Sequence, residues 1–174
     1  MKTNGYEKTH GFSIVMNPNL KGITEADLKE QFVLANNIMQ KTSAANEAVI
    51  HIRKIRDQIT TNKEKISDSD FKNTMTPFLD KIAAIEEELY QVKNQSGQDP
   101  LNFPIKLNNR LASLRRSVEN GEAKPTNGAY KVFEELSAEL EKHMGNLNGV
   151  IQSQLPKVNA VLTDIGATPI EAMK

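Results

Sequence analysis

Histidine and the acidic residues are the side chains of this chain that could bind a metal or transfer a proton. Di-iron helical bundles use a Glu-x-x-His pair, which points both ligands inward from one helix face. Here Ala48 and Leu140 stand three residues before His51 and His143, so this pair is absent. The zinc-protease spacing His-Glu-x-x-His is absent as well. We therefore predict no metal site and no cofactor.

Hydrolytic chemistry finds no support in the acidic residues either. A glycosidase needs two carboxylates that face each other across a cleft, one of them with a raised pKa. The carboxylates here gather in short runs at 86–88, 134–135, 139 and 141, mostly off the apolar positions, which is typical of solvated helix faces. A Gly-x-Ser-x-Gly elbow, a P-loop and a dinucleotide-binding glycine pattern are all missing. No catalytic residue is predicted.

Charge and composition exclude two further classes of partner. The 22 Lys and Arg residues balance the 22 Asp and Glu residues, aromatic residues make up 5% of the chain and tryptophan is absent, which disfavours nucleic-acid binding. No stretch approaches the roughly 20 apolar residues of a membrane span, and the first residues lack the apolar core of a signal peptide, so we expect no membrane insertion. The absence of cysteine excludes disulfides and a thiol nucleophile.

The elements that would position any site are helices. Apolar residues recur at steps of three and four in four segments, which predicts an all-α protein, an up-down-up-down four-helix bundle. We expect the first helix to begin at Thr24, with a capping box to Asp27, and to end at about Thr60. The second helix is expected from Ser69 to Lys93 and the third from about Pro104 to Gly121. The fourth helix is expected from Thr126 to Pro156, where the proline bends or ends it. A last amphipathic turn would follow and close at Gly166. The first helix is expected to bury Leu28, Phe32, Ala35, Met39 and Val49, and the second to bury Phe78 and Ile82.

Two irregularities interrupt these helices. Pro77 lies inside the second, where proline removes a hydrogen bond, so we expect a kink near 74–77 or a restart there. Thr42 and Asn46 fall near the apolar seam of the first helix. They form either a polar layer that sets the register of the helices or a buried polar site.

The first 20 residues differ from the rest and are predicted to be an arm outside the helical domain of residues 21–174. Phe12, Ile14 and Met16 alternate along the chain before the turn at 17–19, which predicts one short strand. A single strand needs a partner for its backbone. It either docks on the helices or is the last strand of a preceding β domain, and we favour the β domain. Unpaired, it would bind that domain or a second copy of the chain.

Other interaction candidates lie around the third helix. The loop before it is rich in glycine and proline and carries Leu101 and Phe103, and the helix itself carries Arg110 and Arg115. The arginine stems either cover the edge of the bundle or bring their charges to a partner.

The stretches NPNLKGITEADLKEQFVLANNIMQ, DPLNFPIKLNNRL and YKVFEEL resemble the C-terminal region of bacterial BNR-repeat (Asp-box) glycosyl hydrolases and sortilin-like β-propeller proteins. The resemblance implies a propeller and a small β domain upstream, with this helical module last, in a periplasmic or secreted parent. An Asp-box needs a tryptophan, so no propeller repeat and no catalytic residue carries over to this chain.

We therefore expect a non-catalytic accessory or interaction module whose partners are the upstream domains of the same polypeptide. The alternative is an independent small enzyme or a ligand-binding bundle, with a site near Thr42, Asn46 or the loop Gln98–Pro104.

Overall fold

The computed structural model describes residues 2–3 and 5–172, and it is predominantly helical, as predicted. Four main helices are joined by shorter elements in the described part of the chain. The elements in chain order are β1 (Lys2–Thr3), β2 (Tyr6–Glu7), α1 (Glu25–Thr61), η1 (Lys63–Lys65), α2 (Asp68–Asp70), η2 (Phe71–Met75), α3 (Thr76–Leu89), η3 (Asp99–Leu101), α4 (Leu107–Val118) and α5 (Asn127–Asp164).

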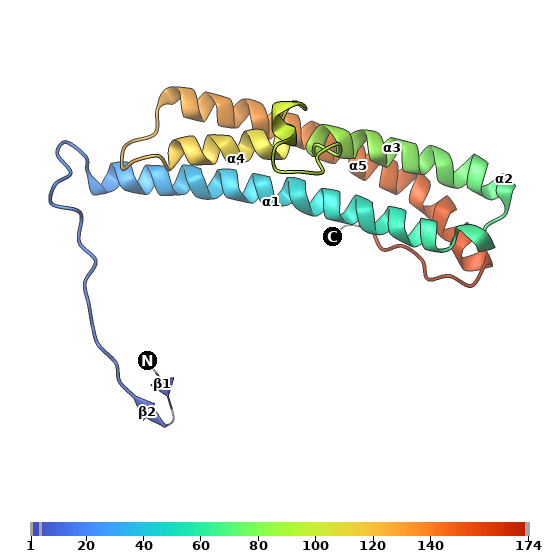
Figure 1. Cartoon of the computed structure of the whole chain (residues 1–174), viewed down its shortest axis with the longest axis horizontal. Helices are drawn as coiled ribbons and strands as arrows, with labels where there is room; N and C mark the ends of the chain where they lie inside the picture. The colour runs from blue at the N-terminus through green and yellow to red at the C-terminus, as the bar shows by residue number, and fades with distance from the viewer. Residues whose placement is uncertain (1, 4, 173–174) are drawn as a thin grey trace.

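Helices α3 and α4 follow one another end to end and run in the same direction (Figure 1). We call them the α3–α4 pair. The end of α3 lies beside the second half of α1, as shown by the hydrogen bond from Arg53 Nε of α1 to Glu86 of α3 at 2.6 Å. The end of α4 lies beside the beginning of α1, as shown by the hydrogen bond from Gln31 Nε2 of α1 to the carbonyl oxygen of Val118 of α4 at 2.7 Å. Both helices are therefore antiparallel to α1.

Helix α5 runs parallel to α1 and completes the arrangement. Lys41 near the middle of α1 pairs with Glu141 of α5 at 3.0 Å, and Gln58 near its end reaches the backbone beyond α5 at Thr168. The predicted up-down-up-down order is thus wrong. With 12 residues, α4 is about 18 Å long, whereas the 37 residues of α1 span about 56 Å, so two helices in line cover one long neighbour.

The helix starts follow the predicted capping residues. Thr24 caps α1 with the expected capping box, in which Asp27 N donates to Thr24 Oγ1 at 3.2 Å and Thr24 N donates to Asp27 Oδ2 at 2.9 Å. The hydrogen bonds from Thr24, first from its side chain, lower the pKa of the Asp27 carboxyl. Thr126 caps α5 by accepting from Ala129 N at 3.2 Å.

The irregularity predicted near Pro77 is a π-helical turn and not a restart, because the backbone stays helical without a break from Asp68 to Leu89. The π turn η2 (Phe71–Met75) directly precedes α3 and widens the helix just before Pro77, which accommodates the proline ring and its missing N–H. Helix α3 then ends at Leu89, four residues before the predicted end. Helix α5 likewise continues through Pro156 to Asp164.

The core is one continuous apolar cluster along the whole length of the helices. Its fully buried side chains come from all four main helices and include Ile38, Ile52, Ile55, Ile59, Phe78, Ile82, Leu89, Leu107, Leu111, Leu140 and Leu147.

The first half of α1 buries only part of the predicted face, since Ala35 lies in the core as predicted but Phe32 and Met39 do not. Phe32 is 69% exposed and Met39 37% exposed, whereas Leu34 and Ile38 lie in the core. This half of α1 carries two overlapping apolar stripes, and the short helix α4 together with α5 covers only one of them. Phe32 and Met39 belong to the uncovered stripe.

A buried carboxylate joins α1 to α3. Glu86 is 1% exposed and accepts from Arg53 and Arg56, whose guanidinium groups lie at the surface end of the pair. The Arg53 guanidinium also lies 4.8 Å from the centre of the Tyr90 ring. Arg53 and Arg56 therefore both bind within the chain.

The predicted strand at Phe12–Met16 is wrong. The described residues of the N-terminal segment pair earlier, in a two-residue ladder of Lys2 with Glu7 and Thr3 with Tyr6. Gly5 has a φ of 83°, which glycine adopts without strain, and it lies in the turn between the two strands. Residues 12–16 have no regular structure, because alternation alone does not supply a partner strand.

The contrast between two phenylalanines tests this packing. Phe78→Ala removes a fully buried ring, and we expect it to lower the free energy of unfolding by about 3–5 kcal/mol. Phe32→Ala, the matched control on the uncovered stripe, is expected to cost less than about 1 kcal/mol. Urea denaturation followed by circular dichroism measures both. Similar losses for the two variants would contradict the assignment of the core.

Candidate functional site

The N-terminal interaction candidates lie at the surface. Phe12 is 86% exposed, Ile14 91% and Met16 38%, and Figure 1 shows this segment leading away from the helices. A turn follows directly, in which Leu20 N donates to Asn17 O at 3.1 Å and Asn19 N donates to Asn17 Oδ1 at 3.0 Å. The apolar side chains are thus held outside the core by a short turn that leads into α1.

The loop before α4 presents Leu101 from a well-bonded frame. Asp99 accepts hydrogen bonds from Gln95 N, from Ser96 N at 2.7 Å and from Ser96 Oγ at 2.8 Å. These bonds, first the one from Gln95, lower the pKa of the Asp99 carboxyl. Buried Gln91, just after α3, donates to Pro104 O at 2.8 Å and ties the end of the loop to its beginning. Leu101 itself is 88% exposed.

Phe103 differs from Leu101, because its ring is half-buried and lies 5.9 Å from the Lys93 ammonium. The loop therefore offers one exposed apolar side chain, Leu101, and one that is already in contact with its own chain.

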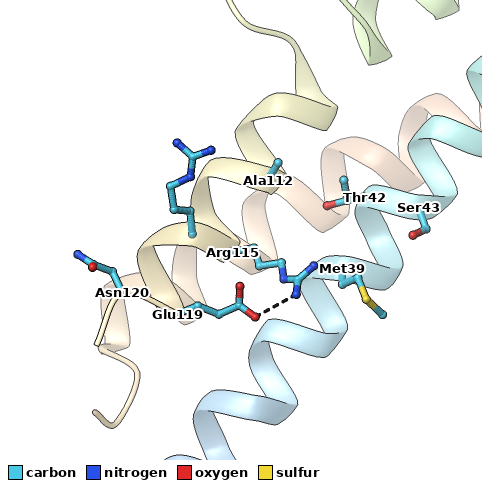
Figure 2. Close-up of a pocket in the computed structure, with 8 residues that line it drawn as sticks. Met39, Thr42, Ser43, Ala112, Arg115, Glu119 and Asn120 are labelled. Carbon is cyan, nitrogen blue, oxygen red and sulfur yellow. Dashed lines mark hydrogen bonds and ion pairs between the residues drawn. The ribbon is translucent and has the colours of Figure 1, made fainter. Parts of the chain in front are cut away.

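The two arginine candidates have different roles. Arg110 donates to both carboxylate oxygens of Glu139, each at 2.8 Å, so it connects α4 to α5. Arg115 donates to Glu119 on its own helix at 3.0 Å and lines an open pocket between α1 and α4 (Figure 2). Only Arg115 faces a space that a ligand could enter.

The pocket beside Arg115 has a volume of about 540 Å³. Figure 2 shows Met39, Thr42 and Ser43 of α1 on one side and residues of α4 on the other. The pocket is lined by Met39, Thr42, Ser43, Ala112, Arg115, Arg116, Glu119 and Asn120. The lining brings two guanidinium groups and two hydroxyls together with the Glu119 carboxylate, which already pairs with Arg115 at 3.0 Å, so Arg116 would be the main attraction for a small anion.

The two polar residues predicted near the seam do not form one site. The Thr42 hydroxyl borders this pocket and donates to Ile38 O at 2.8 Å. Asn46 instead accepts from Asn108 Nδ2 at 3.1 Å across the start of α4, while the buried Oδ1 of Asn108 has no partner among the described residues. The amide pair fixes α4 against α1, and this agrees with the interpretation as a register layer.

Sequence reasoning missed the apolar ridge that α1 presents next to α5. Val33 is 49% exposed, and with Leu34, Tyr130 and Phe133 it borders a groove of about 550 Å³. Val33 directly follows Phe32 and so lies on a different face from the stripe of Phe32 and Met39, and no apolar spacing in the sequence marked it.

The sequence candidates are not brought together into one site. The N-terminal segment leaves the molecule at the beginning of α1, whereas the loop of Leu101 lies near the middle of the helices (Figure 1). Among the described residues, no three His, Asp or Glu side chains lie close enough together to hold a metal ion. No helix in that part of the chain has the length and apolarity needed to cross a membrane.

These observations define the class of protein: a helical protein with an exposed apolar segment at one end and an open pocket between α1 and α4. Comparisons with protein-family models, with curated proteins and with solved structures gave no match for this chain. The resemblance to propeller-linked proteins therefore stays a prediction.

His51 on α1 is the histidine with a perturbed environment. Burial lowers its pKa below the ordinary value of 6.5, and the Lys54 ammonium lowers it further. The unfolded chain then takes up a proton at this side chain at higher pH than the folded chain does. Stability is therefore lost as the pH falls through about 6.5 and below.

This predicts a pH dependence that a substitution can remove. We expect His51→Gln to flatten the decline of the unfolding free energy between pH 7 and pH 5, measured by urea denaturation at each pH. His143→Gln is the matched control and is expected to keep the decline. An unchanged profile in His51→Gln would contradict the role of burial at this residue.

Proposed function

We propose that this chain is a non-catalytic interaction module, in which the four main helices form one bundle that presents the apolar residues 12–16 to a partner. The observation that carries the proposal is the exposure of Phe12, Ile14 and Val15, which are 79–91% exposed within a run of five residues. Contiguous apolar side chains left in water mark contact surfaces.

The partner we propose is a β domain of the same polypeptide, and residues 1–20 are the arm that joins it. The backbone of residues 12–16 has no strand partner in the described structure, so an open sheet edge would satisfy it by β-strand addition. Successive side chains of a strand point to opposite faces, so Phe12, Ile14 and Met16 would share one face of the added strand. Their contacts with the partner would make the binding specific.

The resemblance supplies the larger context of this proposal. The parent would be a periplasmic or secreted β-propeller protein of the BNR-repeat or sortilin-like kind, and any glycosyl hydrolase activity would belong to the propeller.

Hydrogen exchange tests the proposed contact. We expect the amides of residues 12–16 to exchange fast in this chain alone and at least about 100-fold more slowly in the parent polypeptide, because backbone pairing protects them. Ile14→Asp should abolish the protection, whereas the matched change Ser13→Asp, on the opposite face of the strand, should keep it. Equally fast exchange in the parent would overturn the proposal.

The alternative function is a ligand-binding bundle, and the pocket beside Arg115 favours it. Titration with inorganic phosphate followed by NMR distinguishes the two functions. Shifts confined to the pocket that disappear in Arg116→Gln would support ligand binding there, and their absence at millimolar phosphate would leave the module as the function.

A further inference from the structure

The C-terminal residues 167–172, which we call the tail, fold back onto the helices after α5 ends. Gly166, with a φ of 73°, closes α5 in a Schellman motif, in which Ala167 N donates to Leu162 O at 2.8 Å and Gly166 N donates to Thr163 O at 2.9 Å. The predicted cap at Gly166 is confirmed. This motif turns the chain back toward α1.

The tail is held by contacts to its backbone. The Asn159 side chain binds both polar groups of one residue: its Nδ2 donates to Ile170 O at 2.9 Å, and its Oδ1 accepts from Ile170 N at 2.7 Å. Gln58 Nε2 of α1 donates to Thr168 O. Hydrogen bonds to backbone groups do not depend on the side chains of the bound segment.

A single side chain provides the apolar anchor. Ile170 is 5% exposed and belongs to the core cluster, whereas Thr168, Pro169 and Glu171 on either side of it are exposed. An anchor in a pocket plus paired backbone groups is the way in which proteins recognise extended peptides.

The groove is larger than the tail that occupies it. An open space of about 510 Å³ remains between the tail and the α1 residues His51, Lys54 and Gln58. The buried Nε2 of His51 has no hydrogen-bond partner among the described residues. A buried polar atom without a partner costs free energy, so an occupant that brought a hydroxyl or carboxyl group to His51 would gain a hydrogen bond that the tail does not make.

We propose that this groove is a peptide-binding site, which takes an extended segment with an aliphatic anchor from a partner protein and which the tail covers in the free chain. The site is separate from residues 12–16 and does not depend on the function proposed for them. The tail competes from within the same chain, where a short tether gives it a millimolar effective concentration.

The full-length variant Ile170→Ala loosens the tail for a test, because it removes the apolar anchor and leaves only the backbone hydrogen bonds from Asn159 and Gln58 to hold the tail. The probe is a fluorescent peptide with the sequence of residues 166–172, and binding is followed by anisotropy. We expect saturable binding to Ile170→Ala and at least about tenfold weaker binding to the wild-type chain, whose groove is occupied.

Two substitutions in the Ile170→Ala background locate the binding. Asn159→Ala should weaken it about tenfold or more, since two hydrogen bonds to the peptide backbone are lost. Asn148→Ala, an exposed residue of the same helix, should leave it unchanged. The same peptide with Ile170→Asp should fail to bind.

Failure to bind has a clear meaning. No saturable binding to a folded Ile170→Ala protein at about 1 mM peptide would overturn the proposal, because the tail would then be a structural part of the core. A dimer of Ile170→Ala or wild-type chains whose tails are exchanged, seen by light scattering, would make a second copy the occupant and would also overturn it.

Hydrogen exchange on the wild-type chain gives a second measurement if Ile170→Ala does not fold. A displaceable tail opens without global unfolding, so the Ile170 amide should exchange at least about 100-fold faster than the amide of Leu162 in the last turns of α5. Equal protection of the two amides would count against a displaceable tail.

Discussion

The structure depends on a match of lengths. Helices α1 and α5, with 37 and 38 residues, each run about 56 Å, and an apolar face of that length has to be covered throughout. Neither α3 nor α4 is long enough alone, so the chain places them in line along the same face. The loop of residues 90–106 is the joint between them, and its hydrogen bonds to Gln91 and Asp99 let it pass from one helix to the next without reversing direction.

Many charged residues form ion pairs between neighbouring helices of the chain. The pairs Arg110–Glu139 and Lys41–Glu141 join α5 to α4 and to α1 at the surface, and exposed pairs of this kind contribute little to stability. Glu86 is different, because it is buried and would be costly without its two arginines. Several of these charged side chains therefore pair within the chain. Arg110 is one of them, and the sequence had left open whether it covers the edge of the bundle or contacts a partner.

Local chemistry was predictable and long-range direction was not. The capping box at Thr24 and the helix end at Gly166 each depend on a few neighbouring residues, and these two predictions hold. An irregularity near Pro77 is also present, but as a π turn within a continuous helix. The direction of α4 depends on how a 17-residue connection folds, which composition does not determine. The side chain of Asn159 binds the backbone of Ile170, 11 residues further along the chain, and no sequence motif around Asn159 predicts this contact. Thr42 was found because a polar residue at an apolar position is conspicuous.

The parallel course of α1 and α5 sets the distance between the two ends of the molecule. Residues 12–16 leave near Thr24, and the tail docks near Gln58, 34 residues further along the same unbroken helix. At about 1.5 Å per residue, these points lie about 50 Å apart. If both ends bind partners, the helices between them keep the two partners at a fixed separation. Lengthening α1, α5 and the α3–α4 pair by whole turns would change that separation in steps of about 5.4 Å.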